Sequence, residues 1–151
     1  MSSKFVRDSR VEQVHMLMYG DMNGYGRLFG GRLMEWIDVV AGVVSRRHSG
    51  CDVTTAAIDR LDFIAPAYIG DTVVLEGVMT YTGRTSMEVR VDTYVEKLSG
   101  SRERINRAYL VMVALDSEGK PAPVPALIPE SIEEKAEFEA GKKRKKARSR
   151  K

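Results

Sequence analysis

A single helix-like segment lies among five strand-like segments, and this order limits the folds that the chain can adopt. Residues 11–21 alternate apolar and polar side chains and end at a Gly-Asp turn, which predicts a first strand. A helix is predicted from about Gly31 to Arg47, because this segment has a broad apolar face and is followed by Gly50. Four further strands are predicted within residues 53–63, 70–83, 85–97 and 104–116. One helix provides too few crossovers for a doubly wound sheet, so we expect an α+β fold in which an antiparallel sheet of about five to six strands wraps around the helix.

The chain has 151 residues, enough for one domain with a substantial core, and no linker or repeat divides it. We expect an N-terminal segment at residues 1–9 and the folded domain at residues 10–128. A C-terminal helix is predicted at residues 129–141, where Ser131 and Glu134 have the spacing of a capping box. This helix is expected to pack outside the sheet.

The strand within residues 85–97 has the clearest alternation of apolar and polar side chains. Its polar side chains, Glu88, Arg90 and Asp92 among them, fall on one side. We therefore expect this strand to have one face in solvent.

The charge of the chain is divided unevenly. Residues 142–151 hold eight basic and no acidic side chains, and without them 16 basic residues face 21 acidic ones, a net charge of −5. The overall charge of +3 thus depends on this segment. Such a run is usually solvated, so we expect a disordered basic tail. The alternative is that it contacts phosphate groups of nucleic acid or of a phosphorylated ligand.

Several classes of protein are disfavoured by the composition. The N-terminus lacks the apolar region of a signal peptide, and no apolar run is long enough to span a membrane. The one cysteine, Cys51, cannot form an internal disulfide, and no neighbouring His or Cys suggests a metal site. We expect a cytoplasmic protein.

Asp38 lies in the middle of the predicted helix, opposite an apolar face centred on Leu33, Val40 and Val44. A helix face in solvent usually carries Lys, Glu and Gln, whereas most of the residues around Asp38 are small or apolar. The face that Asp38 shares carries Gly31, Met34, Ala41, Gly42 and Ser45. Small residues allow another backbone or a thin ligand to come close. Asp38 is therefore a candidate functional residue; the alternative is a solvent-exposed or capping carboxylate on an ordinary amphipathic helix.

Several motifs between about residues 10 and 130 together resemble one family. The first is N-x-x-G-x-x-F-G-G before the helix with its aspartate, and it matches at Asn23, Gly26, Phe29, Gly30, Gly31 and Asp38. The second, VTTAAIDRLDFIAPAYIGD, matches at Thr55, Asp59, Phe63, Pro66, Gly70 and Asp71. TGRTSMEV at 82–89 and VALDSEGKPAPVP at 113–125 follow. The set resembles the hotdog-fold acyl-CoA thioesterases, most closely the cytosolic acyl-CoA hydrolase branch that contains brain acyl-CoA hydrolase and the small bacterial acyl-CoA thioesterases.

The resemblance implies a hotdog fold and hydrolysis of fatty acyl-CoA to free fatty acid and CoA, without a metal or prosthetic group. Gly30 and Gly31 would begin the helix, so that their backbone N–H groups polarise the thioester carbonyl. Asp38 would act as general base or as nucleophile. Asn23 would orient the water or the carbonyl, because its side chain has both a donor and an acceptor.

The resemblance also implies residues that bind the substrate. They are Phe29 at the start of the helix, Thr55 on the next strand, and a turn formed by Gly83, Arg84, Thr85 and Ser86 at which the family contacts CoA. Arg84 is the sharpest candidate at the turn, because a guanidinium group suits phosphate oxygens. A plain strand threonine and an ordinary turn are the alternative readings of Thr55 and of the turn.

The expected partners follow from the same resemblance. In this family the asparagine and the aspartate that meet come from different hotdog units, which implies a homo-oligomer. We expect at least a dimer and, by the same resemblance, a trimer of dimers, which is a hexamer. The expected ligand is acyl-CoA, and neither a membrane nor nucleic acid is an expected partner.

Other functions remain as alternatives. A non-catalytic acyl-CoA-binding hotdog module, such as a sensor, would need a DNA-binding segment, and only about nine residues precede the first strand. Hotdog dehydratases resemble one another around a histidine near the helix, and none lies between Asn23 and Arg47. A Ser-His-Asp hydrolase is disfavoured because no G-x-S-x-G motif occurs. His15 and His48 are expected to be surface or strand residues.

Overall fold

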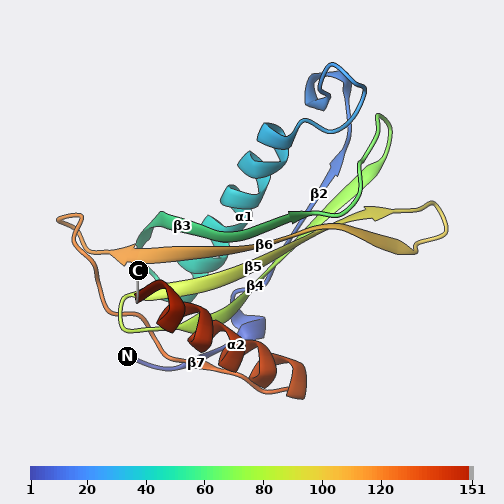
Figure 1. Cartoon of the computed structure of the whole chain (residues 1–151). Helices are drawn as coiled ribbons and strands as arrows, with labels where there is room; N and C mark the ends of the chain where they lie inside the picture. The colour runs from blue at the N-terminus through green and yellow to red at the C-terminus, as the bar shows by residue number, and fades with distance from the viewer. Residues whose placement is uncertain (150–151) are drawn as a thin grey trace.

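The computed structural model describes residues 1–149, and it has one main sheet between two helices (Figure 1). The chain begins with β1 (Lys4–Phe5), η1 (Val6–Asp8), β2 (Val11–Met16), η2 (Tyr19–Asp21) and α1 (Gly30–Ser49). It continues through β3 (Asp52–Phe63), β4 (Thr72–Thr82), β5 (Ser86–Glu96), β6 (Arg102–Leu115), β7 (Leu127–Ile128) and α2 (Ile132–Ser149). The five long strands form an antiparallel sheet in the order β2-β4-β5-β6-β3, and β1 pairs with β7 in parallel. The predicted α+β architecture, with strands around one long helix, is confirmed.

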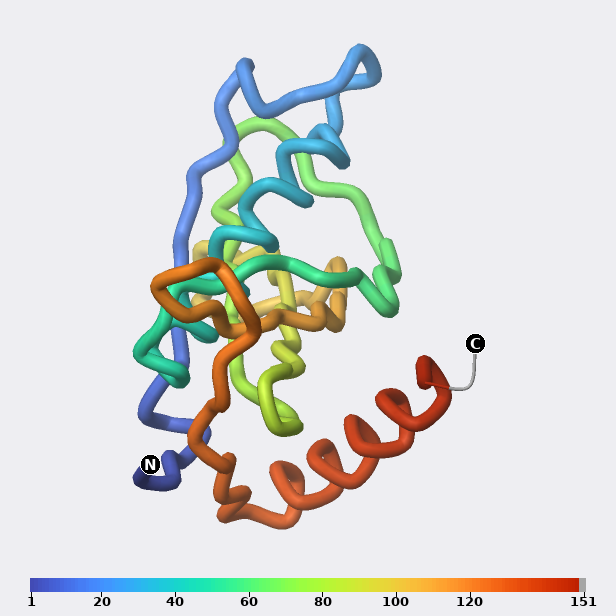
Figure 2. Tube along the Cα trace, turned by 90° about the vertical axis from the view of Figure 1, so that its left-hand side faces the viewer, coloured from blue at the N-terminus to red at the C-terminus, as the bar shows by residue number. Residues whose placement is uncertain are grey.

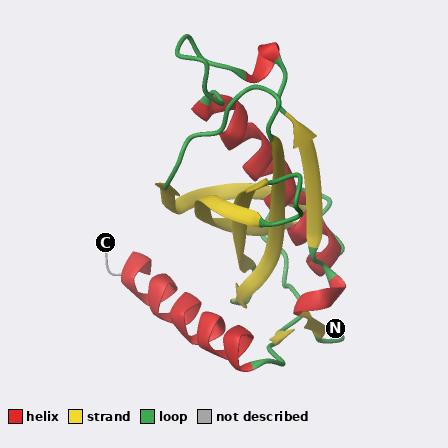
Figure 3. Ribbon diagram, turned by 90° about the vertical axis from the view of Figure 1, so that its right-hand side faces the viewer, coloured by secondary structure: helices red, strands yellow, loops and turns green. Residues whose placement is uncertain are grey.

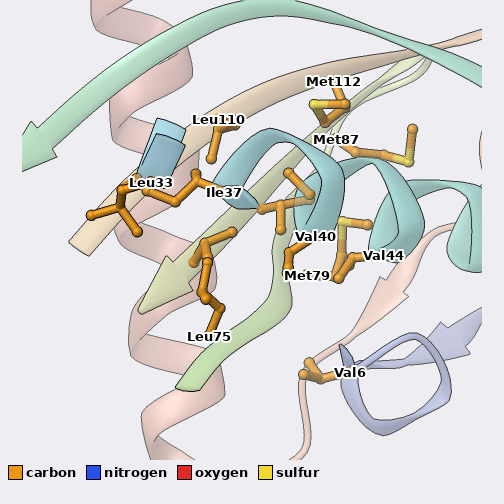
Figure 4. Close-up of a cluster of buried hydrophobic side chains, with 14 of the residues drawn as sticks. Val6, Leu33, Ile37, Val40, Val44, Leu75, Met79, Met87, Leu110 and Met112 are labelled. Atoms are coloured by element: carbon orange, nitrogen blue, oxygen red, sulfur yellow. The ribbon is translucent and has the colours of Figure 1, made fainter. Parts of the chain in front are cut away.

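The core lies between α1 and the sheet. Side chains at helical spacing on α1 are almost completely buried: Leu33, Ile37, Val40 and Val44. Figure 4 shows them directed toward side chains of the strands, among them Leu75, Met79, Met87, Leu110 and Met112. Gly77 on β4 allows the close approach of the helix, because a Cβ atom there would lie 2.5 Å from Val40 Cγ1. This packing fixes which face of α1 remains outside the core.

β3 is an edge strand of the sheet, with β6 as its one neighbour in the sheet order. Its pairing with β6 shifts register between Thr55 and Ala57 and again between Ile58 and Arg60. Such bulges bend a strand and redirect its side chains. The open edge is therefore irregular beside α1.

α2 lies on the face of the sheet opposite α1, as the side views show (Figures 2 and 3). Its start follows the sequence: the Ser131 hydroxyl accepts the backbone N–H of Glu134 at 3.0 Å. The Glu134 carboxylate accepts the N–H of Glu130 instead of that of Ser131, so the predicted reciprocal box is shifted by one residue.

The C-terminal segment differs from the predicted disordered tail. α2 continues through Lys142 to Ser149 without a break, and residues 150 and 151 lie outside the described part. The physical reason is a set of ion pairs with the sheet. Arg144 donates two hydrogen bonds to Glu88, at 2.7 and 2.8 Å, and Arg148 donates one to Asp59 at 2.9 Å.

The polar face of β5, which the alternation had placed in solvent, is covered: Arg144 of α2 pairs with Glu88, and Arg107 of β6 pairs with Asp92. The side chains of Glu88 and Asp92 are only 1% and 4% exposed. Glu137 of α2 joins the set; burial acts to raise its pKa, but hydrogen bonds from Arg144 and Arg90 lower it below the ordinary value. The interface between α2 and the sheet is thus held by charges as well as by apolar packing.

Candidate active site

The N-terminus of α1 has free backbone donors. α1 begins at Gly30, its N-cap Phe29 makes no capping hydrogen bond with its side chain, and no acidic residue occurs in the first turn. Within residues 1–149 the backbone N–H groups of Gly30 and Gly31 form no hydrogen bond. The positive end of the helix dipole lies at the same place. This helix end can therefore polarise a carbonyl oxygen.

Two aromatic rings flank these glycines. A Cβ atom on Gly31 would lie 2.7 Å from the ring of Phe29, and one on Gly30 would lie 4.0 Å from the ring of Phe63. Both rings are more than half exposed. Phe29, expected to bind substrate, thus lies directly over Gly31. A ligand at the helix end would contact both rings.

An apolar cavity of about 300 Å³ opens beside this helix end. Its lining comes from the loop before α1, from α1, from the end of β3 with the segment that follows it, and from β6: Arg27, Leu28, Leu33, Phe63, Ile64, Ala65, Pro66, Ala67 and Ile105. The motif match included Phe63 and Pro66 but gave them no role. Leu33 and Ile105 are far apart in the chain, so only the fold brings them together.

Asp38 is exposed on α1 and is held by Thr55 of β3. The Thr55 hydroxyl donates a hydrogen bond of 2.6 Å to Asp38 Oδ1. The second carboxylate oxygen, Oδ2, forms no hydrogen bond within residues 1–149. The hydrogen bond to Oδ1 therefore fixes the orientation of the carboxylate and leaves Oδ2 free. The two residues, expected separately as a catalytic group and a substrate contact, form one unit.

Asp38 and the free amides lie on one face of α1 but at a distance from each other. Gly31 and Asp38 are seven residues apart, close to two full turns, which corresponds to about 10 Å along the helix axis. A base and an oxyanion donor both need to lie about 3 Å from the reacting group that they serve. One copy of α1 is poorly suited to supply both groups to the same carbonyl.

Asn23 lies in the loop that leads into α1, and its side chain holds that loop together. Its Oδ1 accepts the N–H of Tyr25 at 2.8 Å and that of Arg27 at 3.2 Å. Gly26, with φ of 75°, completes the turn. The side-chain carbonyl is thus occupied, and Nδ2 remains as a donor. No hydrogen bond joins Asn23 to Asp38 within the described chain.

The turn of Gly83 to Ser86 joins β4 and β5 and is firmly held by backbone hydrogen bonds. The N–H of Gly83 donates to the carbonyl of Ser86 at 2.8 Å, and the carbonyls of Arg84 and Thr85 accept from Val124 and Ala114. The Arg84 side chain is exposed and forms no ion pair within residues 1–149. The structure places this turn at one end of the sheet, apart from Gly30 and Gly31.

Neither histidine belongs to this site. His15 stacks on Trp36 with ring centroids 3.9 Å apart. His48 is a buried residue of α1, not a surface or strand residue as expected, and its Nε2 lies 2.7 Å from the carbonyl oxygen of Pro125. Burial lowers the pKa of His48, which favours the neutral ring. Both histidines act in packing.

Within residues 1–149 no three His, Cys, Asp or Glu side chains gather as a group that could hold a metal ion. In the same range neither helix is both long enough and apolar enough to cross a membrane.

Comparison with known proteins identifies the relatives of this chain. The Thioesterase superfamily model matches residues 25–99. The uncharacterized acyl-CoA thioester hydrolase YkhA of Bacillus subtilis is 41% identical over 133 residues, covering 87% of this chain and 77% of that protein. The cytosolic acyl coenzyme A thioester hydrolase of Rattus norvegicus is 37% identical over 140 residues, covering 90% of this chain and 36% of that protein. The chain thus spans little more than a third of the rat enzyme.

Solved structures show the same fold at similar identity. A hexameric acyl-CoA thioesterase without ligand has a TM-score of 0.95 at 40% identity, covering 99% of this chain and 97% of that one. The acyl-CoA hydrolase of Staphylococcus aureus, in complex with butyryl coenzyme A and coenzyme A, has a TM-score of 0.93 at 32% identity, covering 97% and 90%. Alanine variants of that hydrolase at one asparagine, one aspartate and one threonine have the same fold. The chain therefore belongs to the Thioesterase superfamily, as one of its hotdog-fold acyl-CoA thioesterases.

Proposed function

We propose that this chain hydrolyses fatty acyl-CoA thioesters to free fatty acid and CoA. The observation that carries the proposal is the pair of unused N–H groups at the start of α1, beside an apolar cavity. An acyl chain in the cavity would bring its thioester carbonyl to Gly30 and Gly31. One such oxyanion donor stabilises the transition state by about 3 kcal/mol in other enzymes. The acyl-CoA substrates named for the relatives support the same assignment.

Asp38 would supply the second chemical group. As a general base, it takes a proton from water, whose oxygen attacks the carbonyl carbon and gives a tetrahedral oxyanion at the glycine N–H groups. Collapse of this intermediate breaks the C–S bond, and the proton passes from Asp38 to the CoA thiolate. As a nucleophile, Asp38 would attack the carbonyl carbon and break the C–S bond, which releases CoA thiolate and leaves an acyl anhydride. Water then hydrolyses the anhydride to the fatty acid and the free Asp38 carboxylate, and the proton released passes to the thiolate. The hydrogen bond from Thr55 orients the carboxylate for either route.

The site is proposed to be shared between two copies of the chain. The separation of about 10 Å along α1 supports the assignment of Gly31 and Asp38 to different sites. In a two-fold dimer, Asn23, Gly30 and Gly31 of one copy would meet Asp38 and Thr55 of the other. Asn23 would then donate from Nδ2 to the water or the carbonyl, because its Oδ1 is occupied. The hexameric relative supports a trimer of such dimers.

Arg84 is proposed to bind a phosphate group of CoA. Its guanidinium is exposed and has no acidic partner within residues 1–149. A planar guanidinium binds phosphate oxygens with two parallel hydrogen bonds. The neighbouring Thr85 and Ser86 would let the ligand approach the turn, while the space beside Gly83 is occupied by Lys145 Nζ.

Release of free thiol from acyl-CoA esters of graded chain length tests the proposed function. We expect turnover by the parent protein and an optimum at the chain length that fills the cavity. Binding of acyl-CoA without any thiol release would contradict hydrolysis and favour the non-catalytic acyl-CoA-binding module. Absence of both binding and release would contradict the substrate class as well.

A further inference from the structure

The basic segment of α2 contains lysines that the fold leaves without anionic partners. Arg144 and Arg148 are paired with Glu88, Glu137 and Asp59. Within residues 1–149, no acidic side chain lies within 4 Å of the four lysines of this segment: Lys142, Lys143, Lys145 and Lys146. The paired arginines therefore account for the docking of α2 on the sheet. The four lysines have no such role in ion pairs within residues 1–149.

Lys145 differs from the other three because it is directed at the turn between β4 and β5. A Cβ atom on Gly83 would lie 2.1 Å from Lys145 Nζ, so the ammonium group occupies the space that a side chain at position 83 would need. The same Nζ lies 6.0 Å from the centroid of the Tyr81 ring. Lys145 is partly buried. The ammonium group has no acidic partner within residues 1–149, so its three N–H donors are available to a bound anion.

Two cations that have no acidic partner within residues 1–149 are thus found at this turn: Lys145 Nζ beside Gly83, and Arg84 as the next residue of the chain. In Figure 1 the turn lies next to the C-terminal end of α2. An ammonium group and a guanidinium group at one turn suit a ligand with more than one phosphate oxygen.

The strand register relates this turn to the catalytic residues. Met87, which follows the turn on β5, pairs with Met112 on β6, and Met112 pairs with Thr55 on β3. Two strand spacings separate Thr55 from Met87, about 10 Å. A thioester held at Asp38 and Thr55 would thus need a long polar extension to reach the turn. The pantetheine arm of CoA, which ends in phosphate groups, has that form.

We propose that Lys145 of α2, together with Arg84, binds the phosphate groups of the CoA portion of the substrate. The inference rests on the proposed function, and it makes α2 a part of the substrate site as well as a cover for the sheet. Gly83 is needed in this arrangement because any side chain there would displace the ammonium group. Lys145 would distinguish CoA thioesters from thioesters without these phosphates.

Lys145→Ala is the test variant, and Lys143→Ala is its control. Lys143 is on the same helix but two residues, about 200°, away from Lys145 around the axis, and it is exposed. With acyl-CoA, we expect Lys145→Ala to raise KM at least about tenfold, the effect of one charge-assisted hydrogen bond, with kcat unchanged. Lys145→Arg should restore most of the loss. With an acyl-pantetheine, which lacks the phosphates, Lys145→Ala and the parent should have the same KM.

Binding of CoA itself, measured by calorimetry, separates this inference from the proposed hydrolysis. Weaker CoA binding by Lys145→Ala, with equal pantetheine binding, supports the inference even if the parent releases no thiol. Equal CoA binding by Lys145→Ala and Lys143→Ala would overturn it and leave the hydrolysis untouched. Equal losses of affinity for CoA and pantetheine would also overturn it, because they indicate a structural role. Far-UV circular dichroism of each variant checks that α2 remains folded.

Discussion

Asp38 lies on a face of α1 that the core does not cover, yet its position is fixed. Thr55 holds one carboxylate oxygen at 2.6 Å, and the other is free of hydrogen bonds within residues 1–149. A carboxylate with one oxygen held and the other free is suited to act on a water molecule or a carbonyl group that comes from outside the chain. The roles of both residues can be separated by substitution.

We expect Asp38→Asn to fold normally and to lose at least about 10²-fold in kcat. The amide is nearly isosteric and can still accept the Thr55 hydroxyl hydrogen, but it can neither take a proton nor attack as a carboxylate. Steady-state thiol release, with circular dichroism and thermal unfolding as folding controls, gives the measurement. Parent-like turnover in a well-folded variant would remove Asp38 from the mechanism.

Thr55→Val should lower kcat by about tenfold with little change in stability. The side chain keeps its shape but loses the hydroxyl, so the carboxylate gains freedom and reaches its productive orientation less often. Thr55→Ser is the matched control, because it keeps the hydroxyl and should retain most activity. If Val and Ser were equally active, the hydrogen bond would have no catalytic role.

Ala65→Leu should shorten the preferred acyl chain. Ala65 lines the cavity beside the helix end, and a larger side chain would occupy part of its volume of about 300 Å³. Each methylene excluded from an apolar site loses about 0.8 kcal/mol, about fourfold in kcat/KM. We expect losses on long acyl-CoA esters but not on the shortest. Ala136→Leu, at an exposed position of α2 outside the cavity lining, is the control, and an identical chain-length profile in both variants would place the acyl chain elsewhere.

α2 is attached to the sheet through buried charges. Arg144 donates to Glu88, which is 1% exposed, and to Glu137 on its own helix. Removal of one partner of a buried ion pair costs about 3–5 kcal/mol, because the remaining charge is left uncompensated. Here Thr80 still donates to Glu88 at 2.7 Å, which places the cost at the lower end.

We therefore expect Arg144→Met to lower the free energy of unfolding by about 3 kcal/mol in urea denaturation. Lys146→Met, on the same helix but exposed and without an ion pair within residues 1–149, should change it by less than about 0.5 kcal/mol. Equal effects of the two substitutions would mean that α2 is held by apolar contacts alone.

The elements show where inference from the sequence succeeds and where it stops. The periodicity of α1 and the alternation of the strands are local signals, and they predicted both the helix and the strands around it. The burial of Glu88 was not predictable from its own strand, since the partner that covers it is Arg144, 56 residues later. The run of basic residues was predicted to be disordered for the same reason. The acidic residues that pair with it lie far away in the chain, on β3 and β5. The cavity also depends on residues brought together only by the fold.

The single chain has an open sheet edge at β3, and its candidate catalytic groups are divided between two places along α1. Edge strands with free backbone groups are ready to pair with another copy. Asn23 and the free glycine amides lie at the start of α1, and the Asp38–Thr55 unit lies about two turns further along it. A two-fold axis between two copies can bring the start of α1 in each copy to the Asp38–Thr55 unit of the other. The dimer then has two complete sites.

Complementation between two inactive variants tests this shared site. Asp38→Asn removes the carboxylate, and Asn23→Asp keeps the oxygen that accepts from Tyr25 and Arg27 while it removes the Nδ2 donor. Each homodimer should then be nearly inactive. When the two variants are denatured and refolded together, random pairing makes about half of the dimers mixed. In a mixed dimer one site carries both substitutions and the other carries neither.

Activity should therefore return to about a quarter of the parent value from two nearly inactive proteins. If Asn23 and Asp38 of the same copy served one site, every site would carry a substitution, and mixing would restore nothing. Mass spectrometry under native conditions confirms that mixed dimers have formed. With mixed dimers present, failure to recover activity would assign both residues to one chain, and α1 would then have to bend or the substrate would have to bridge about 10 Å between Gly31 and Asp38.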